Sequence, residues 1–400
     1  MKTMDFLLIG GGIIGISIAR ELKSRYPDSS VCILEKENEC GLHASGRNSG
    51  VLHAGFYYTS DSFKARFTRE GNQLLTEYCD EKNIKLNKCG KLVVAQNESE
   101  LFWLDELMNR ANKNGVPLKS ITEEESRSIE PRVKTYQRAL FSPTTSSVNP
   151  KELVKSLLSD AIEEGVLVRS NTRYSGRTGK RSIQTSGGIF EAKYLINVAG
   201  LYADKIGRDF GFSKNYQILP FKGLYLYSNE PPGAIKTHIY PVPDLANPFL
   251  GVHFTVTTDG KVKLGPTAIP AFWREQYGGW SNFNLNELTE IFLRQAGLFL
   301  SSNFDFKSLA IRELQKYSKL KLVSLASSLA TGVDIKNYHK WGQPGIRAQL
   351  LNIREKKLEM DFVLEGDDQS MHILNAVSPG FTCALPFAKY VCDQIKNKLN

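Results

Sequence analysis

The sequence predicts an α/β protein, α+β overall, and three patterns support this prediction. A short apolar run, Asp5–Ile9, is followed by a glycine-rich turn and then by helical apolar spacing over Ile13–Leu22. The same order of strand, glycine turn and helix returns at residues 194–204. Residues 216–267 instead alternate as strands rich in Tyr, Val, Phe and Pro. The first two patterns are typical of a doubly wound sheet, and the third predicts a mainly antiparallel sheet.

The first glycine turn predicts a dinucleotide-binding site. Gly10 permits a tight turn, Gly12 lets backbone N–H groups approach a pyrophosphate, and Gly15 permits close packing of helix on strand. Glu35 follows the next apolar strand, 20 residues after Gly15, where an acidic side chain accepts hydrogen bonds from an adenosine ribose. The alternative is a glycine-rich turn without a ligand. The residues expected to line this part of the cofactor site are Gly10, Gly12, Ile13, Ile14, Gly15, Glu35 and Lys36.

The composition is that of an ordinary globular protein with room for two domains. The chain has 400 residues, 41% of them hydrophobic and 23% charged, and this length can bury two cores. No stretch supplies the ~20 consecutive apolar residues that cross a bilayer. Met1-Lys2 and the apolar stretch after them resemble a secretory signal, but the glycines would interrupt its helix. We therefore expect this end to be retained and the protein to be cytoplasmic.

The charge and the cysteines narrow the range of partners. A net charge of +9 favours a small anionic substrate and is compatible with peripheral contact at the inner face of an anionic membrane. Most of these charges are expected to be ordinary solvated surface. No basic stripe interleaved with aromatic residues is present, so no nucleic acid is expected. The six cysteines contain no Cys-x-x-Cys pair, which argues against a metal site and a disulfide framework.

The domains follow from the order of the remaining elements. We expect a Rossmann-like nucleotide domain built from residues 1–85, 145–215 and 335–400, interrupted by a substrate domain of residues 86–144 and 216–334. The further predicted elements are a helix over Ser62–Cys79, a strand over Gly90–Gln96, a helix over Leu101–Asn112, a helix with Asn149 as N-cap and Pro150 at its first position, a hairpin turn at Thr258–Lys261, a helix over Asn286–Leu300, strands at Ile346–Leu351 and Met371–Leu374, and a final helix to about Lys398.

Longer segments carry a family resemblance that selects the dinucleotide. The glycine turn, the loop His43–Gly55 and the turn Asn197–Asp204 together resemble the FAD-dependent oxidoreductases related to D-amino acid oxidase. Within that superfamily the chain is most similar to L-2-hydroxyglutarate dehydrogenases and oxidases. The segments that carry this closer resemblance are Asn48–Tyr58, Ile239–Pro243, Phe249–Thr255 and Gly345–Leu350.

The resemblance implies FAD as cofactor and adds further residues to its site. These residues are Ser45, Gly46, Asn48, Ser49, Gly50, Gly200, Gly380, Phe381 and Thr382. The loop also departs from the subfamily, whose pattern reads closer to His-Gln-Thr-Gly-His-Asn-Ser-Gly. Ala44, Ser45 and Arg47 stand at three of those positions, and Arg47 changes the charge beside the expected flavin. Some members of the superfamily attach FAD through a histidine near this loop, which makes His43 or His53 a possible link.

The expected chemistry needs a held carboxylate, a base and an α-carbon close to flavin N5. Arg347 matches the family's carboxylate-binding arginine, and its planar guanidinium suits bidentate binding. Lys222, Tyr240 and Arg47 are candidates for the rest of the substrate site. Histidine is the side chain best suited to act as a base near neutral pH. The candidate catalytic residues are His253, His53 and Arg347.

These observations favour oxidation of a small 2-hydroxy acid to the 2-oxo acid by hydride transfer to flavin N5, with L-2-hydroxyglutarate as the first candidate substrate. The alternatives on the same fold are an amine or amino-acid oxidase, acting on glycine or sarcosine for example, and an enzyme similar to glycerol-3-phosphate dehydrogenase. A non-catalytic dinucleotide-binding protein and a nicotinamide dehydrogenase are further alternatives. The electron acceptor is expected to be oxygen or a quinone. The sequence leaves the oligomeric state open.

Overall fold

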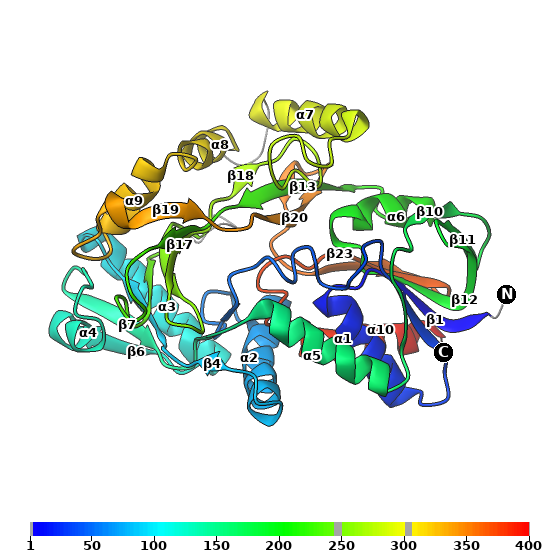
Figure 1. The fold of residues 1–400 in the computed structure, drawn as a ribbon, viewed down its shortest axis with the longest axis horizontal. Helices are drawn as coiled ribbons and strands as arrows, with labels where there is room; N and C mark the ends of the chain where they lie inside the picture. Colours follow the sequence, from blue (N-terminus) through cyan, green and yellow to red (C-terminus); the bar gives the residue numbers. More distant parts are fainter. Residues whose placement is uncertain (1–2, 244–249, 301–305, 400) are drawn as a thin grey trace.

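The computed structural model describes residues 3–243, 250–300 and 306–399. Met1 and Lys2 of the signal-like start, and Phe249 of the quoted segment Phe249–Thr255, lie outside these residues. Figure 1 shows two sheet regions side by side, with the two termini at the same end of the molecule.

The first region is a twisted sheet centred on β1 (Met4–Ile9). Strand β1 pairs in parallel with β2 (Val31–Leu34) on one side and with β12 (Gly188–Asn197) on the other. Both faces of these strands are covered, which explains their nearly continuous apolar sequence. The other members of the sheet are β9 (Leu167–Arg169), β10 (Tyr174–Arg177), β11 (Ser182–Thr185), β22 (Val363–Gly366) and β23 (Ser370–Asn375).

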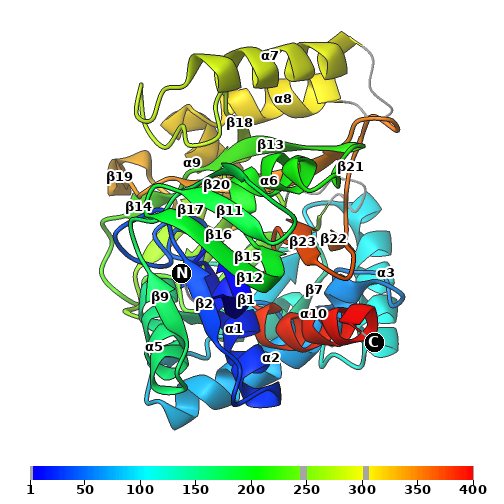
Figure 2. The ribbon, with the colours of Figure 1, turned by 90° about the vertical axis from the view of Figure 1, so that its right-hand side faces the viewer.

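Helices cover the two faces of this sheet, as a doubly wound fold requires. On one face, α1 (Ile13–Arg25) lies between α5 (Pro150–Glu163) and α10 (Ala384–Leu399), as Figures 1 and 2 show. Residues of all three helices pack against β1 and β2 in one apolar core. On the other face lies α6 (Ala203–Asp209), which follows a short 3-10 turn, η2 (Gly200–Tyr202). The predicted α/β sheet is confirmed.

Local signals place the N-termini of two helices at the predicted position or within one residue of it. The Asn149 side chain accepts a hydrogen bond from the Lys151 N–H and caps α5, with Pro150 in the first position. Helix α2 (Phe63–Glu81) begins after Ser62, whose Oγ accepts from the Ala65 N–H. Such caps satisfy N–H groups that a helix cannot pair internally.

The second region contains a curved sheet in the order β19-β14-β17-β16-β15-β5-β7-β6. Its pairs are antiparallel except β15 with β5, which is parallel, so "mainly antiparallel" is the correct description. The hairpin of β16 and β17 turns at the predicted residues 258–261. Its strands are β5 (Lys91–Val94), β6 (Lys119–Thr122), β7 (Arg138–Ser142), β14 (Leu226–Ser228), β15 (His238–Pro241), β16 (His253–Val256), β17 (Val262–Gly265) and β19 (Tyr338–Trp341).

A third sheet joins the two regions. Strand β20 (Gly345–Asn352) pairs along its whole length with β13 (Tyr216–Gly223), so residues 338–358 share sheets with 216–270, although the domain prediction assigned them to the nucleotide domain. The domain boundaries stay a prediction. The remaining elements are β3 (Val51–Leu52), β4 (Leu86–Asn87), β8 (Ser146–Val148), β18 (Ile269–Pro270), β21 (Lys357–Leu358), α3 (Leu101–Asn114), α4 (Glu123–Ile129), α7 (Leu285–Leu300), α8 (Phe306–Gln315), α9 (Lys319–Ser327), η1 (Glu98–Glu100) and η3 (Ile335–Asn337).

Candidate active site

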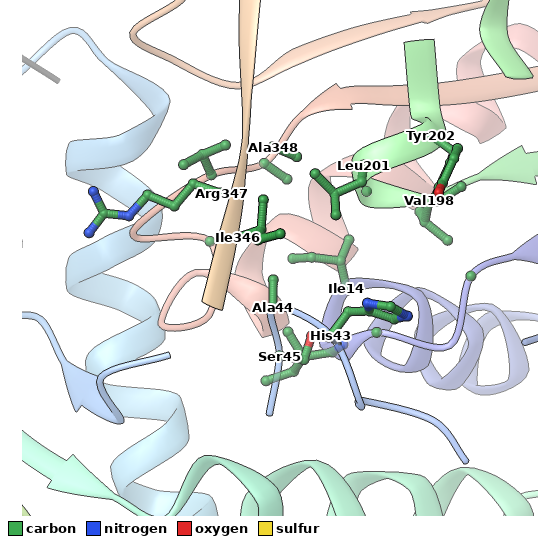
Figure 3. Close-up of a pocket in the computed structure, with 18 of the residues that line it drawn as sticks. Ile14, His43, Ala44, Ser45, Val198, Leu201, Tyr202, Ile346, Arg347 and Ala348 are labelled. Carbon is green, nitrogen blue, oxygen red and sulfur yellow. Dashed lines mark hydrogen bonds between the residues drawn. The ribbon is translucent and has the colours of Figure 1, made fainter. Parts of the chain in front are cut away.

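A long pocket begins at the carboxyl ends of the parallel strands β1, β2 and β12 and ends beside β20. This edge is where open α/β sheets bind ligands. Figure 3 shows Ile14, Ser45, Val198 and Ile346, from four separate segments, facing one space. The predicted residues that line the pocket are Gly10, Gly12, Ile13, Ile14, Gly15, Glu35, Lys36, Ser45, Arg47, Asn48, Ser49, His53, Gly200, Arg347, Gly380, Phe381 and Thr382.

The glycine turn is built so tightly that side chains are excluded. Gly10 has φ +124°, and a Cβ at this position would lie 2.5 Å from the Val198 carbonyl oxygen. A Cβ at Gly15 would lie 2.2 Å from the carbonyl oxygen of Gly10 itself. The backbone segments at this turn therefore pack closer to one another than any other residue type would permit. This agrees with the roles that the sequence predicts for the two glycines.

Glu35 is buried at the end of β2 with its carboxylate fixed by the backbone. Its Oε2 accepts from the Gly11 N–H at 2.9 Å, and its Oε1 accepts from the Glu37 N–H at 2.9 Å. A carboxylate offers about four acceptor positions. Two therefore remain for a diol at the pocket wall.

The loop after β2 supports the N-terminus of α1. Gly12 is the N-cap and provides no capping side chain, while Ser45 Oγ accepts from the Ile13 N–H at 2.9 Å. The Asn48 amide folds the loop by donating to Ser45 O at 2.8 Å and accepting from the Gly50 N–H at 2.7 Å. The positive end of the helix dipole thus faces the pocket, where anions bind well.

The C-terminal tail closes the opposite end. Gly380 approaches Ala376 so closely that a Cβ would lie 2.1 Å from the Ala376 carbonyl oxygen. Thr382 is fully buried, and its Oγ1 accepts from the His53 N–H at 3.2 Å. Residues from the two ends of the chain thereby meet beside the pocket.

A loop between β18 and α7 reaches over the glycine-turn end, which sequence reasoning missed. Lys36 Nζ contacts Glu275, His43 Nδ1 lies 2.5 Å from the Tyr277 hydroxyl, and the Arg47 guanidinium stacks 4.3 Å from the Tyr277 ring centre. No sequence pattern signalled these contacts, because more than 200 residues separate the partners.

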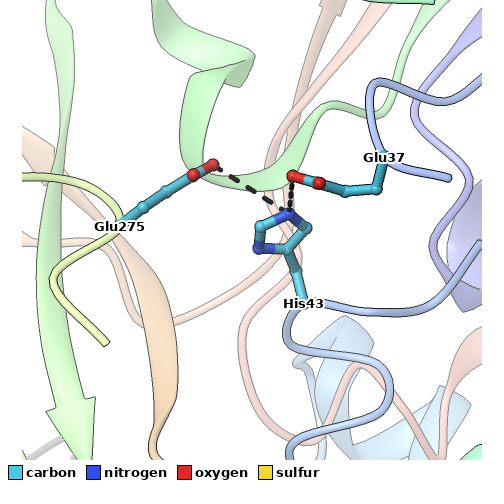
Figure 4. A group of neighbouring side chains, drawn as sticks. All are labelled: Glu37, His43 and Glu275. Carbon is cyan, nitrogen blue, oxygen red and sulfur yellow. Dashed lines mark hydrogen bonds and ion pairs between the residues drawn. The ribbon is translucent and has the colours of Figure 1, made fainter. Parts of the chain in front are cut away.

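Figure 4 shows three side chains that come together at this loop, those of Glu37, His43 and Glu275. Each offers one atom that could ligate a metal ion. His43 Nε2 lies 2.9 Å from Glu37 and 4.0 Å from Glu275, while Lys36 Nζ contacts both carboxylates. Burial alone would raise the pKa of Glu37, but hydrogen bonds from Lys36 and His43 outweigh it and hold the pKa at about 2. Both carboxylates are thus already paired with groups of the protein.

A buried ion pair fixes the same loop to the second glycine turn. Arg274 donates from Nη1 to Asp204 Oδ1 at 2.6 Å and from Nη2 to Asp204 Oδ2 at 2.9 Å, and neither side chain is exposed. Asp204 Oδ2 also accepts from the Ile218 N–H at 3.1 Å. The pair connects α6, β13 and the loop, so it holds the pocket wall in place.

The β20 end of the pocket carries Arg347 and His53. Figure 3 shows the Arg347 side chain leaving β20 on the side opposite Ile346 and Ala348, as strand alternation requires. His53 is partly exposed, into the pocket. Burial lowers the pKa of His53 to about 3, helped by the charges of Lys91 and Arg347. A neutral imidazole and a guanidinium therefore share this end.

The family model described as DAO, FAD dependent oxidoreductase, matches residues 5–394. The chain belongs to this family. It is 34% identical over 421 residues to the mitochondrial L-2-hydroxyglutarate dehydrogenase of Homo sapiens, covering 99% of this chain and 89% of the relative. It is 33% identical over 400 residues to the L-2-hydroxyglutarate dehydrogenase of Escherichia coli K12, covering 99% and 94%.

Solved structures agree on the fold of this DAO-family chain. An L-α-glycerophosphate oxidase from Mycoplasma pneumoniae with FAD bound superimposes with a TM-score of 0.78 at 21% identity, covering 99% of this chain and 95% of that one. A glycine oxidase from Geobacillus kaustophilus gives a TM-score of 0.72 at 18% identity, covering 100% and 96%. The predicted fold class, enzyme class and cofactor are confirmed.

The residues of the DAO-family pocket fit FAD. The close-packed glycine turn and the open N-terminus of α1 suit a pyrophosphate, and the two remaining acceptor positions of Glu35 suit a ribose diol. Gly46 and Gly50 do not line the pocket. A Cβ at Gly46 would lie 2.5 Å from Gly41 O, and one at Gly50 would lie 2.3 Å from Val148 O. Their positions indicate a packing role in the loop.

Three other predicted residues also lie outside the pocket lining, namely His253, Tyr240 and Lys222. His253 is 3% exposed, stacks on Tyr240 with ring centres 3.7 Å apart, and contacts Gly251 O through Nδ1 at 2.8 Å. Lys222 is buried on β13, and its pKa is lowered by burial. Arg47 does line the pocket, but its Nε donates to Leu42 O at 2.7 Å, which anchors the loop. The roles of all four in substrate binding or catalysis stay predictions.

Proposed function

We propose that this FAD-dependent oxidoreductase converts L-2-hydroxyglutarate to 2-oxoglutarate. The observation that carries the proposal is the similarity along nearly the whole chain to L-2-hydroxyglutarate dehydrogenases from both bacteria and animals. The β20 end of the pocket supports it, since Arg347 and His53 both line that end. An arginine and a neutral histidine are the groups that a 2-hydroxy acid needs.

In this proposal each residue has a separate task. Arg347 binds the C1 carboxylate through its planar guanidinium and thereby orients the C2 hydrogen. His53 is neutral because its pKa is lowered, so one imidazole nitrogen can accept the proton of the C2 hydroxyl. The substrate's negative charge offsets the nearby cations and makes the imidazole more basic once the complex forms. FAD, when bound, supplies the hydride acceptor.

Anaerobic titration tests the proposal directly. L-2-Hydroxyglutarate should bleach the visible absorption of the purified holoenzyme, whereas glycine, sarcosine and glycerol 3-phosphate should not. Arg347→Met should lower kcat/KM by about 10²-fold or more because a charge-assisted, bidentate contact is lost. Bleaching by an amine or by glycerol 3-phosphate alone would replace the proposed substrate.

For the electron acceptor we propose a membrane quinone rather than oxygen, reached by peripheral contact with an anionic bilayer at the inner face of the membrane. Helices α7 and α8 lie together at one end of the molecule in Figures 1 and 2. Their outward apolar side chains include Phe292, Leu293 and Leu300, which are 55%, 66% and 85% exposed. Two exposed basic residues lie on α8, Lys307 and Arg312, and a third, Lys321, lies on the next helix, α9. Apolar anchors with neighbouring cations suit an anionic membrane surface.

Vesicle sedimentation separates the acceptor proposal from the substrate proposal. The holoenzyme should sediment with phosphatidylglycerol vesicles, and Leu293→Glu should reduce the bound fraction several-fold without changing anaerobic bleaching. Phe102→Glu is the matched control, because Phe102 is 68% exposed on α3 in the other region. Equal loss of binding in both variants, or fast reoxidation by oxygen with none by a soluble quinone, would contradict the acceptor proposal. No helix among the described residues is long and apolar enough to span a membrane.

A further inference from the structure

Lys91 is a buried cation that the site described above does not use. It lies on β5, is 0% exposed, and its Nζ has no hydrogen-bond partner among the described residues. Three aromatic rings surround it, with Nζ 4.5 Å from the centre of Phe56, 4.4 Å from Tyr57 and 4.9 Å from Tyr240. Ring faces attract a cation but do not accept its hydrogen bonds as a carboxylate does.

Two more unpartnered donors lie beside it. His238 stands opposite Lys91 in the β15–β5 pair, and its Nδ1 accepts from the Val256 N–H at 3.0 Å. A neutral imidazole bonded in this way carries its hydrogen on Nε2, and that nitrogen is buried without a partner among the described residues. The Tyr57 hydroxyl is likewise buried and unpaired within the described part of the chain.

The three groups share one chemical character. An ammonium, an imidazole N–H and a phenol O–H are all donors, and buried donors are normally paired. Leaving a buried donor unpaired destabilises the fold, so three neighbouring unpaired donors indicate that a ligand supplies the acceptors. A carboxylate does so, because its two oxygens offer about four acceptor positions and its charge matches that of lysine.

The cluster adjoins the β20 end of the pocket. Tyr57 and Phe56 lie on the segment that continues from His53, which lines the pocket. Tyr240 stacks on His253 in the same cluster. The charges of Lys91 and Arg347 both act on His53, so this imidazole lies near both cations.

We propose that Lys91, His238 and Tyr57 form a second anion subsite that binds the distal carboxylate of a 2-hydroxy dicarboxylate and so determines substrate specificity. The inference rests on the proposed function, in which Arg347 holds the C1 carboxylate. Arg347 and Lys91 then bind opposite ends of one substrate, and His53, which lies near both cations, acts at the C2 hydroxyl. A monocarboxylate would leave the three buried donors unpaired, which is how a polar site rejects an analogue.

Paired substrates test the subsite in the holoenzyme. L-2-Hydroxypentanoate has the same chain length as L-2-hydroxyglutarate but lacks the distal carboxylate. Wild-type kcat/KM should favour the dicarboxylate by about 10²-fold or more. In Lys91→Met this ratio should fall at least tenfold, through loss of activity on the dicarboxylate only. Lys119→Met, an exposed lysine on β6 of the same sheet, should keep the wild-type ratio.

A binding measurement keeps the inference testable if Lys91→Met does not fold or the substrate is wrong. Glutarate and pentanoate lack the reactive hydroxyl, so both can be titrated against the flavin absorption of wild-type holoenzyme. Glutarate should bind at least tenfold more tightly than pentanoate. Equal binding of the two, or an equal loss of activity on both substrates in Lys91→Met, would overturn the subsite. Failure of L-2-hydroxyglutarate to bleach the flavin, together with selective glutarate binding, would overturn only the proposed function.

Discussion

The two ends of the pocket treat buried charge in opposite ways. At the glycine-turn end, Arg274 is fully buried but bonded through two nitrogens to Asp204, and both oxygens of Glu35 accept backbone N–H groups. Near the β20 end, Lys91 is equally buried and has no hydrogen-bond partner among the described residues. Paired charges hold the pocket wall in place, whereas unpaired donors can still form hydrogen bonds with a ligand.

The difference reflects what each end has to do. A loop from the second region must stay fixed against the sheet, and a bidentate ion pair provides a defined geometry for it. A substrate must enter, bind and leave, so the groups that recognise it cannot be saturated by the protein itself. Unpaired donors lower stability, and such costs are common at functional sites.

Breaking the buried ion pair of Arg274 and Asp204 should produce the largest loss of stability. In Arg274→Met the buried Asp204 carboxylate loses both bonds from Arg274 and keeps only one guanidinium, that of Arg208, at 3.2 Å from Oδ2, which should cost roughly 3–5 kcal/mol of unfolding free energy. Thermal and denaturant unfolding of the holoenzyme would measure it. The control is Arg66→Met, which breaks an exposed pair with Glu70 and should cost at most about 1 kcal/mol. Similar losses in both variants would show that the buried pair does not fix the loop.

Replacing the unpaired Lys91 should change the unfolding free energy in the opposite direction. Burial lowers the pKa of Lys91 to about 7, which means that the fold disfavours its ammonium form. Lys91→Met should therefore raise the unfolding free energy at pH 7 by roughly 1–4 kcal/mol while weakening the binding of the dicarboxylate. The same unfolding experiments measure this change, and Lys119→Met should stay within about 0.5 kcal/mol of wild type. A loss of stability in Lys91→Met would assign the lysine a structural role.

Sequence reasoning reached the glycine-turn end better than the β20 end. The glycines, Glu35 and the Asn149 cap act through neighbours a few residues or one strand away, so their spacing predicts their geometry. The contacts of Glu275 and Tyr277 join segments more than 200 residues apart and leave no local pattern.

Strand alternation limits what the sequence can predict at the β20 end. It indicates which residues share a face, but not which face meets the pocket. For this reason the sequence offers Lys222 as a candidate and gives no comparable indication for Lys91, although neither lysine is among the residues that line the pocket. A lysine opening the apolar run Lys91–Val94 was the one available signal for the latter.

Lowering the pH should destabilise both ends of the molecule through their buried histidines. Burial lowers the pKa of His372, on strand β23 of the sheet at the glycine-turn end, to about 4, and that of His238 to about 3. Below an unfolded pKa of about 6.5 the unfolded chain takes up protons that the folded chain refuses, so stability is full above pH 6.5 and falls as the pH drops. Each histidine should lower the unfolding free energy by roughly 1 kcal/mol between pH 7 and 5.5.

Denaturant unfolding at several pH values would measure this slope. His372→Asn should reduce it whatever the variant's overall stability, because the slope depends only on the protons taken up. An unchanged slope in His372→Asn would contradict a neutral buried imidazole at that position.

Proton uptake on ligand binding offers the finest comparison of the two ends. At pH 8 most Lys91 side chains are neutral, given a pKa of about 7. A bound distal carboxylate favours the ammonium and raises that pKa, so glutarate binding should draw protons from the buffer, approaching one per ligand. Calorimetry of the holoenzyme in two buffers of different ionisation enthalpy measures this number. Lys91→Met should abolish the uptake, whereas Lys119→Met should preserve it. Uptake that persists in Lys91→Met would have to come from another group near the ligand, and the distal carboxylate would then not bind at Lys91.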